Sequence, residues 1–407
     1  MYALLSRPEG LAMLRRWRDR QVIKVITGVR RCGKSTLLTL FQRELLAEGV
    51  PAANIIALAM DDLANAELVT NHKNLHDYII ENLAPTGTTY VFLDEVQLVE
   101  HYERMADSLL LRANIDLYIT GSNASLLSGE LATLLSGRYV ELSLLPLSFA
   151  EFVTGRRQQN PDDLSLTALY TEYIRYGSFP FVLNLIPDAV AVSDYLNGIL
   201  DTVLLKDVVI RQQVSTAAAL EDVVRFLFHN IGNLTSLRRV SAGLESAGRS
   251  PSSTTIDKYI SGLTSAYLCY PARRWDVKGL RYLTGSEKYY VVDPGLRAAL
   301  VGFTGSDTGH ILENIVFLEL VRRNGKVRVG AVASGEIDFV VGDGADTVYY
   351  QVCETLRDPA TLARELKPLL ALRDHHPKYL LTLDQNPPIS HDGILQISCL
   401  DWLMAQP

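Results

Sequence analysis

The sequence predicts an α/β fold built on a parallel, doubly wound sheet of five strands. Five short apolar runs, near residues 22–27, 54–59, 89–94, 116–121 and 139–144, alternate with segments that have helical apolar spacing. A glycine-rich loop follows the first run, and two acidic residues end the third. Alternating strands and helices form parallel sheets, and ligands of such sheets bind at the carboxyl ends of the strands. We therefore expect the polar residues after these strands to lie at one edge.

The loop after the first strand has the spacing of a phosphate-binding loop. Gly28, Gly33, Lys34 and Ser35 match G-x-x-x-x-G-K-[ST], between a strand (QVIKVIT) and a helix (STLLTLFQRELLAEG). Glycines let successive N–H groups wrap a phosphate chain at the helix N-terminus. Lys34 is expected at the β- and γ-phosphates of ATP and Ser35 at Mg²⁺. The expected nucleotide-binding residues are Gly28, Val29, Arg30, Arg31, Cys32, Gly33, Lys34, Ser35 and Thr36.

The third strand supplies two acids. TYVFLDEVQ, residues 89–97, places Asp94 and Glu95 after a buried apolar run. A buried parallel strand would carry both to its C-terminal edge. We expect Asp94 to orient the Mg²⁺ water shell and Glu95 to polarise the attacking water.

Two further candidate site residues lie next to the fourth and fifth strands. Asn123, after IDLYITGSN, is expected to hydrogen-bond the water or the γ-phosphate, although Gly121, Ser122 and Asn123 would also suit an ordinary turn. A short helix is expected before Arg138, which precedes the fifth strand. An arginine there would lie at the edge of the domain, within reach of a neighbouring subunit's γ-phosphate.

For the middle of the chain, the sequence predicts a helical region followed by a winged helix. Apolar spacing up to about Gln213 predicts a helical lid over the nucleotide. From Ala218 the order is three helices followed by the strand pair LCYPARRWD and KYYVVD. Residues 235–290 hold nine basic and four acidic residues, a surplus of five in a chain of net charge −7. This asymmetry favours DNA contact, although winged helices also bind proteins. The candidate DNA-binding residues are Arg238, Arg239, Lys258, Arg273 and Arg274.

The last hundred residues place acids on a helix and on successive strands. Glu313 lies in HILENIVFLELVRR, Asp338 in SGEIDFVV, and Gln351 and Cys353 in YYQVCE. This layout resembles the PD-(D/E)xK nuclease fold, in which acids and a lysine gather Mg²⁺ and activate water. Here an amide and a thiol replace an acid and the lysine, so we expect no DNA cleavage. Glu313 and Asp338 could hold a weakly bound Mg²⁺, or be structural, tied to a backbone group and to an arginine respectively.

Composition excludes several other classes. With 407 residues and 48% apolar content, the chain is long enough for about three globular domains. Its four scattered cysteines suggest neither disulfides nor zinc, and no secretory segment is seen at the N-terminus. No apolar run approaches the roughly 20 residues of a membrane span. We expect a cytoplasmic protein without a membrane role.

Taken in order, TGVRRCGKST, FLDE, TGSN, SGRY and LPLSF resemble the AAA+ ATPases. GVRRCGKST and YGSFPFVL are similar to one bacterial and archaeal group, in which the ATPase core precedes a winged helix and a nuclease-like domain. The likeness covers nearly the whole chain. It implies an ATPase core over 1–145, a lid over 146–214, a winged helix over 215–300 and a restriction-endonuclease-like domain, inactive as a nuclease, over 301–407.

The same resemblance implies roles for individual residues. By this resemblance, Lys34 binds the phosphates, Ser35 and Asp94 are Mg²⁺ ligands, and Glu95 is the catalytic glutamate. Asn123 is the sensor residue at the nucleotide, and Arg138 is an arginine finger that acts in trans, on the nucleotide of a neighbouring subunit. ATP and Mg²⁺ are the expected cofactors and a homo-oligomeric ring the expected assembly. The leading hypothesis is an ATPase that remodels or translocates DNA, with branched DNA as one candidate. The alternatives are a nucleotide-controlled switch that gates a protein partner in defence or signalling, and an ATP-dependent nuclease.

Overall fold

The computed structural model describes residues 4–405, apart from 125–136, 160–163, 211–216, 247, 250, 304 and 306. These residues form two compact units. One is Met1–Leu145 with Ser265–Tyr267, and the other is Pro146–Thr264 with Leu268–Pro407. The short helix expected before Arg138 falls outside the described residues.

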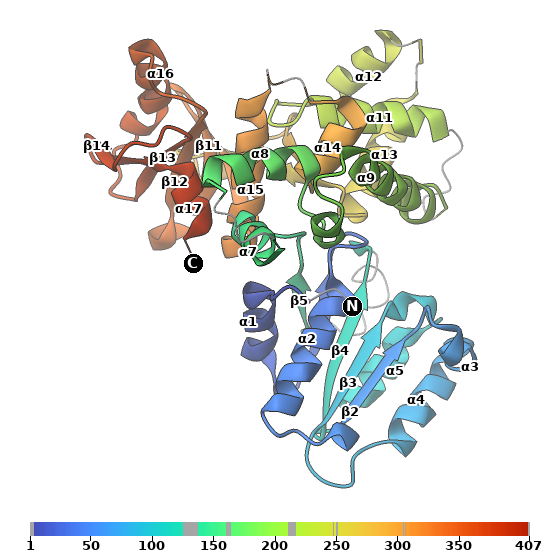
Figure 1. Ribbon diagram of the computed structural model, residues 1–407. Helices are drawn as coiled ribbons and strands as arrows, with labels where there is room; N and C mark the ends of the chain where they lie inside the picture. The colour runs from blue at the N-terminus through green and yellow to red at the C-terminus, as the bar shows by residue number, and fades with distance from the viewer. Residues whose placement is uncertain are drawn as a thin grey trace. The chain divides into compact units, whose positions relative to one another are not determined.

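A five-stranded parallel sheet forms the centre of the first unit (Figure 1), in the order β2-β3-β4-β1-β5. All five strands expected from the sequence are present. They are β1 (Ile23–Thr27), β2 (Ile55–Ala59), β3 (Thr89–Asp94), β4 (Ile115–Gly121) and β5 (Tyr139–Ser143). The loop after β1 and the turns after β3 and β4 consequently share one edge of the sheet.

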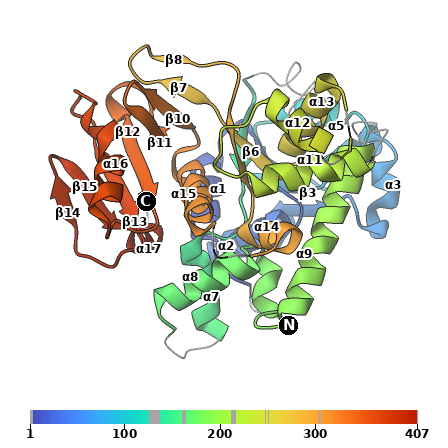
Figure 2. The ribbon, with the colours of Figure 1, turned by 90° about the horizontal axis from the view of Figure 1, so that it is seen from above.

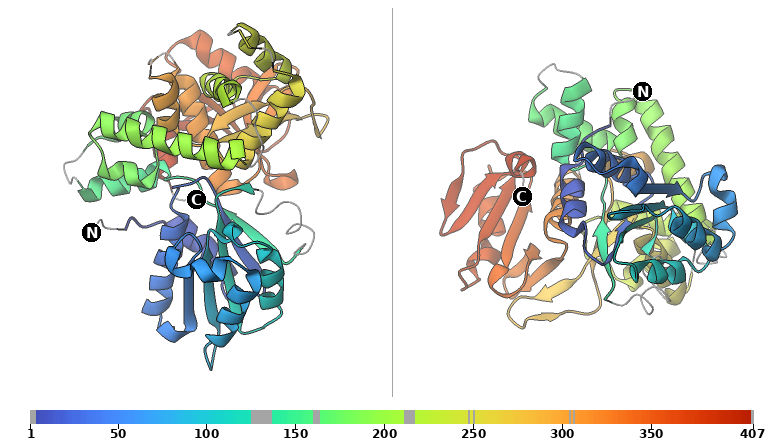
Figure 3. Two further views of the ribbon diagram at one scale, coloured as in Figure 1. Left: turned by 90° about the vertical axis from the view of Figure 1, so that its right-hand side faces the viewer. Right: turned by 90° about the horizontal axis from the view of Figure 1, so that it is seen from below.

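Helices cover both faces of this sheet, as the blue and cyan elements of Figure 3 show. Successive side chains of β3 alternate between the faces. Val91 and Leu93 pack into the core that contains residues of α4 and α5, whereas the ring of Phe92 meets that of Phe41 on α2. Because both faces are covered, β1 and β4 are buried along their whole length. The helices of this unit are α1 (Pro8–Trp17), α2 (Lys34–Ala47), α3 (Ala66–Val69), α4 (His72–Glu81) and α5 (Tyr102–Leu110).

The second unit begins with helices where the lid is expected. They are α7 (Phe149–Gln159), α8 (Leu166–Tyr176) and α9 (Ala189–Val203), which runs into a π-helical turn at Leu204–Val209. Helix α14 (Pro294–Val301) packs against α8, α9 and α11 (Ala217–His229). Its buried N-cap, Asp293, accepts hydrogen bonds from the backbone N–H and the hydroxyl of Ser178 at 2.5 and 2.6 Å. This contact gives YGSFP a structural role, since it joins α8 to α14.

Three helices and two strands follow α9. Helices α11, α12 (Leu237–Ser246) and α13 (Ser253–Ser265) precede β6 (Cys269–Ala272), which pairs antiparallel with β9 (Lys288–Val291). A single bridge joins Thr235, between α11 and α12, to Glu287. The strand pair expected here is therefore present.

The segment between β6 and β9 does not stay with that pair. Strands β7 (Arg274–Asp276) and β8 (Arg281–Tyr282) form a hairpin, and β7 lies alongside β10 (Val327–Val332) in the second sheet of the unit (Figure 2). The side chains of Trp275 and Val277 pack into the apolar core of that sheet, which explains its place. The C-terminal sheet thus includes residues from the segment 215–300. The four-domain division stays a prediction.

The C-terminal sheet has eight strands in the order β14-β15-β13-β12-β11-β10-β7-β8. Besides β7, β8 and β10 these are β11 (Gly335–Val341), β12 (Val348–Cys353), β13 (Lys378–Thr382), β14 (Ile389–His391) and β15 (Ile394–Ser398). Helices α15 (Thr308–Asn324), α16 (Pro359–Leu370) and α17 (Cys399–Met404) pack against it. Strands β12, β13 and β15 are parallel to one another, and β10, β11 and β12 are antiparallel neighbours.

Candidate functional site

The loop after β1 requires glycine where it begins. Gly28 has φ +144°, a conformation that side chains rarely adopt, and a Cβ atom there would lie 2.2 Å from the carbonyl oxygen of Leu144. The backbone of the loop consequently passes directly against the chain after β5. Arg7, which is buried, fixes the same region by donating to the carbonyl oxygens of Cys32 at 3.0 Å and Leu145 at 2.8 Å.

The loop ends at the N-terminus of α2. Gly33 is the N-cap, has φ 105°, and offers no side-chain cap, and the first turn of the helix contains no acid. Its unpaired N–H groups and the helix dipole favour an anion at this place. Lys34 is buried and its ammonium donates to the carbonyl oxygens of Gly28 at 2.9 Å and Val29 at 3.1 Å. The loop therefore fits the phosphates of a nucleotide, which the lysine and the N–H groups would bind.

The two acids meet β4 at the same edge. Parallel pairing of β3 with β4 sets Leu93 opposite Ile119, so that Asp94 comes beside Thr120. The Thr120 hydroxyl donates to the Asp94 carboxylate and accepts from the backbone N–H of Glu95 at 3.0 Å. Thr120 thus positions both acids. The sequence did not identify it, because its role depends on which strands are neighbours.

The carboxylate of Glu95 is already hydrogen-bonded. It accepts from the amide of Gln97 and, at 3.4 Å, from the hydroxyl of Ser122. Glu95 itself has φ 53°, a left-handed conformation that turns the chain after β3. Asn123 is buried just after β4 at this edge. Ser35 and Asp94 have the oxygen ligands that suit Mg²⁺, which would neutralise phosphate charge there.

A further cluster lies beside the loop. The hydroxyl of Thr27, the last residue of β1, donates to the carboxylate of Glu141 on β5 at 2.7 Å, and the Tyr267 hydroxyl donates to the same oxygen at 3.3 Å. Burial raises the pKa of Tyr267, so its phenol stays protonated at neutral pH. Nothing in the local sequence around residue 267 indicated this contact with Glu141, which lies 126 residues earlier in the chain.

Arg138 lies at the opposite edge of the sheet from the loop. Its carbonyl oxygen accepts from the backbone N–H of Ile23, at the start of β1, and its exposed guanidinium pairs with Asp107 on α5. A strand rises about 3.3 Å per residue, so β5 separates Arg138 from the level of its own loop by about 15 Å. The Arg138 side chain therefore lies far from the phosphate-binding loop of its own chain.

The five candidate DNA-binding residues differ in exposure. Arg238, Arg239 and Lys258, on α12 and α13, are exposed. Arg273 is exposed and pairs with Glu287 at 3.4 Å, whereas Arg274 is half-buried in β7. Lys288, which contributed to the basic surplus of this segment, is buried among acids and is not part of its surface.

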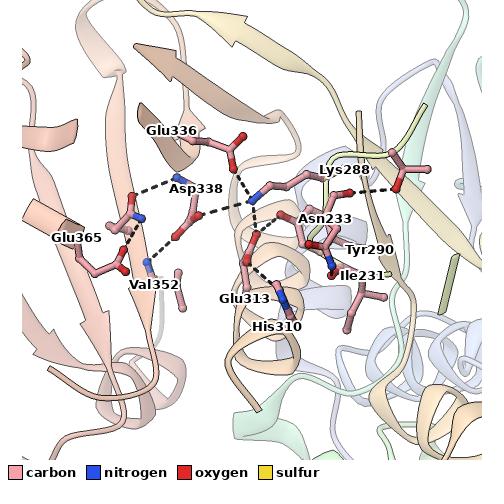
Figure 4. A network of polar contacts seen from close by, with 12 residues as sticks. Ile231, Asn233, Lys288, Tyr290, His310, Glu313, Glu336, Asp338, Val352 and Glu365 are labelled. Carbon is pink, nitrogen blue, oxygen red and sulfur yellow. Dashed lines mark hydrogen bonds and ion pairs between the residues drawn. The ribbon is translucent and has the colours of Figure 1, made fainter. Parts of the chain in front are cut away.

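The nuclease-like residues come together around that lysine (Figure 4). Glu313 on α15 accepts from the Lys288 ammonium at 2.8 Å and from the Tyr290 hydroxyl at 2.6 Å. Asp338 on β11 accepts from the backbone N–H of Val352 at 2.9 Å and lies 3.7 Å from Lys288. The expected structural partners, a backbone group for Glu313 and an arginine for Asp338, are therefore wrong. Side chains of β9 take their place, because β9 packs against α15.

The two substituted positions are occupied by neutral groups. The Gln351 side chain accepts from the backbone N–H of Asp338 at 3.3 Å and donates to Glu365 on α16 at 2.8 Å. The Cys353 thiol donates to the carbonyl oxygen of Thr355, and burial raises its pKa to about 11. A thiol is neutral when protonated and negative when ionised, so in neither form can Cys353 act as the cation that the lysine would supply.

Asp338 should make stability depend on pH. Burial, followed by the charge of Glu313, raises the pKa of its carboxyl to about 8 from an ordinary 3.8, against the opposing charge of Lys288. Between these values the folded protein holds a proton that the unfolded chain releases, so this group favours folding less as pH rises. In the parent, the unfolding free energy should fall as pH rises over this range. Asp338→Asn is expected to make that slope less steep by up to about 1.4 kcal/mol per pH unit.

Denaturant unfolding between about pH 4 and 8, followed by tryptophan fluorescence, would measure this slope. Glu313, Glu336, Glu365 and Lys288 surround Asp338 and stay unchanged in the variant. Asp346→Asn, at an exposed position, is the matched control and should retain the parental slope. Equal slopes in parent and Asp338→Asn would show that Asp338 is ionised in the folded protein.

The five-stranded order, the glycine loop and the acid pair define the nucleotide-binding domain of a P-loop ATPase. Residues 20–153 match the family model described as an AAA domain, and residues 167–307 match a domain of unknown function. The Walker-type ATPase PABY2304 of Pyrococcus abyssi has a similar fold, with a TM-score of 0.51 and 14% identity over 73% of this chain and 95% of that one.

Two curated proteins are similar over most of the chain. A Haemophilus influenzae protein is 38% identical over 403 residues, which cover 99% of each chain, and its name is only "uncharacterized protein". A Methanocaldococcus jannaschii protein, also named as uncharacterized, is 28% identical over 85% of this chain and 77% of its own. The chain belongs to the family of the H. influenzae protein, and it carries an AAA domain. In the described parts, no helix is long and apolar enough to cross a membrane.

Proposed function

We propose that the protein is an ATPase that hydrolyses ATP in a homo-oligomeric ring and uses the energy to remodel or translocate DNA. The observation that carries the proposal is the placement of its charged groups. Lys34, Asp94 and Glu95 share the loop edge of one sheet, and Arg138 lies exposed at the other edge. In a head-to-tail ring, one subunit's Arg138 would complete the site of the next.

Within this proposal each group has one task. Lys34 and the N–H groups of residues 28–36 bind the phosphates. Ser35 and Asp94 hold Mg²⁺, which supplies charge neutralisation at the β- and γ-phosphates. Glu95 orients and polarises the attacking water, and Asn123 hydrogen-bonds the water or the γ-phosphate. Thr120 keeps the two acids in position.

DNA contact is proposed for the helices α12 and α13. Their exposed Arg238, Arg239 and Lys258 supply positive charge in a chain whose net charge is −7. Three helices followed by an antiparallel strand pair support a winged helix here. Steady-state ATPase rates with single-stranded, duplex and branched DNA would test the proposal, and a rate that no DNA changes would contradict it.

A slow nucleotide-controlled switch is the second candidate function. It is favoured by the hydrogen bonds that Gln97 and Ser122 make to Glu95, which engage the carboxylate needed to polarise water. A switch should turn over slowly and without response to DNA, whereas a DNA-remodelling ATPase should be stimulated. The same rate measurement therefore separates the two.

Reversing charge on the two basic helices should weaken DNA binding through phosphates. Arg238→Glu with Lys258→Glu is expected to lower affinity for every sequence alike and to flatten the log–log salt dependence by about 0.9 per lost contact on duplex DNA. Lys73→Glu with Lys326→Glu makes the same charge change at exposed positions elsewhere and should leave the slope unchanged. Titrations at several salt concentrations measure both. Equal slopes in the two double variants would remove these helices from the DNA interface.

A further inference from the structure

The carboxylates of the nuclease-like layout do not fit a metal ion. Mg²⁺ binds oxygens at about 2.1 Å in near-octahedral geometry. Within the described ranges, no group of three or more histidine, cysteine, aspartate or glutamate residues is arranged to hold a metal. Gln351 and Cys353 also replace two of the groups that such a site would use. The acids that remain must therefore be balanced in another way.

Lys288 lies where these acids converge (Figure 4). Its ammonium is 2.8 Å from Glu313, 2.8 Å from Glu336 and 3.7 Å from Asp338, and its side chain is 5% exposed. An ammonium carries three donors, and about 2.8 Å is the usual length of a charge-assisted N–H···O bond. These oxygens are consequently spaced for a protonated amine and not for a divalent ion.

The charges of the cluster agree with this geometry. Burial alone would lower the pKa of Lys288, but Glu313, Asp338 and Glu336 outweigh burial and raise it. Burial would likewise raise the pKa of Glu313, but Lys288 and the hydrogen bonds to the carboxylate lower it. Both partners are therefore ionised at neutral pH, and each stabilises the charged form of the other.

The lysine comes from outside the C-terminal strands. Lys288 and Tyr290 are alternate residues of β9 and point to the same carboxylate of Glu313. The next residue of α15, Asn314, makes both backbone hydrogen bonds of Val291, at 2.8 and 2.9 Å. The ring of Tyr290 also stacks on Phe317, with centroids 4.2 Å apart. One face of α15 thus binds β9 along its length.

We propose that Lys288 is the resident cation of this carboxylate cluster and stands in place of a divalent metal ion, so that the C-terminal sheet is a metal-independent scaffold held to β9. The cluster is then a cation site, and the cation bound in it is a side chain of the protein itself. Removing the ammonium should leave the charges of Glu313 and Glu336 uncompensated beside Asp338 and turn the cluster into an acceptor of divalent cations. This inference does not depend on the ATPase activity.

The test compares the full-length parent with Lys288→Ala and uses Mn²⁺ as the probe, in the absence of nucleotide. In the parent, Glu313→Gln should leave the difference in thermal midpoint between EDTA and Mn²⁺ unchanged. Lys288→Ala should have a lower thermal midpoint in EDTA and should recover part of it in Mn²⁺. It should also bind Mn²⁺ at least about tenfold more tightly than the parent, because the carboxylates have lost the ammonium that lies between them.

Matched variants separate this effect from others. Lys326→Ala removes an exposed lysine that pairs with Asp343, and should gain no Mn²⁺ affinity. Lys288→Ala combined with Glu313→Gln should lose the gain. The ATPase unit is identical in all these proteins, so any Mn²⁺ bound there cancels in the comparison. No sample should cut supercoiled, linear or branched DNA in Mg²⁺ or Mn²⁺.

Three results would overturn the proposal. They are parental Mn²⁺ binding that disappears in Glu313→Gln, DNA cleavage by the parent that disappears in Asp338→Ala, and a folded Lys288→Ala protein that Mn²⁺ neither binds nor stabilises. If Lys288→Ala does not fold in EDTA, folding on addition of Mn²⁺ supports the proposal. Lys288→Met, which keeps the aliphatic stem, then repeats the comparison, and the parental Mn²⁺ titration remains decisive by itself.

Discussion

Lys34→Ala should abolish nucleotide binding, whereas Glu95→Gln should preserve binding and stop hydrolysis. Lys34 holds the only buried ammonium among the described residues of the loop, and its hydrogen bonds to the carbonyl oxygens of Gly28 and Val29 keep that ammonium at the loop. Glu95 follows β3, which β4 separates from β1, and it contacts no loop residue through any of its hydrogen bonds described above. The first change removes phosphate binding, and the second only the carboxylate that polarises water.

Both variants are expected to lower turnover by about a hundredfold or more. Binding of a fluorescent ATP analogue and steady-state phosphate release would separate them, since only Glu95→Gln should retain the analogue. Glu48→Gln, an exposed substitution of the same kind at the end of α2, is the control and should turn over at the parental rate. Parental hydrolysis by Glu95→Gln would show that another group activates the water.

The sequence predicted the first unit well because its central strands β1, β3 and β4 are buried on both faces. Runs such as YVFL in β3 are apolar without interruption, and glycines or acids mark where such strands end. The sequence did not indicate a role for Thr120, because its contact with Asp94 depends on the pairing of β3 with β4, which no local pattern shows. The contacts of Arg7 and Tyr267 could not be predicted for the same reason, since each residue reaches the loop region from another part of the chain.

The second unit was harder to predict for a different reason. The sequence placed Arg274 in a wing, but the alternation of Trp275 and Val277 carries β7 into the C-terminal sheet. Charge counting treated Lys288 as surface, because a count of basic residues does not register burial. In the nuclease-like layout the lysine is expected at position 353, where this chain has a cysteine. The structure instead supplies an ammonium from Lys288 on β9, 65 residues earlier in the chain, and no local pattern could indicate that contact.

Arg138→Ala should bind ATP normally and hydrolyse it at least about a thousandfold more slowly, as expected for loss of an arginine that acts on a neighbour's γ-phosphate. Its guanidinium is exposed and pairs only with Asp107 in the contacts described for its side chain, at the sheet edge away from its own loop. Loss of the side chain therefore leaves the subunit's own phosphate site intact. Arg112→Ala, also exposed and just after α5, is the control and should keep parental turnover.

Mixing experiments distinguish action on a neighbour from a structural role of Arg138. A Lys34→Ala subunit has no working site but retains Arg138, while an Arg138→Ala subunit has an intact site and no finger. In a random equal mixture of a head-to-tail ring, about a quarter of the sites pair an intact loop with an intact arginine, so about a quarter of the parental rate should return. Neither protein alone should exceed its background. If mixed assembly is verified and no activity returns, Arg138 does not act across a subunit interface.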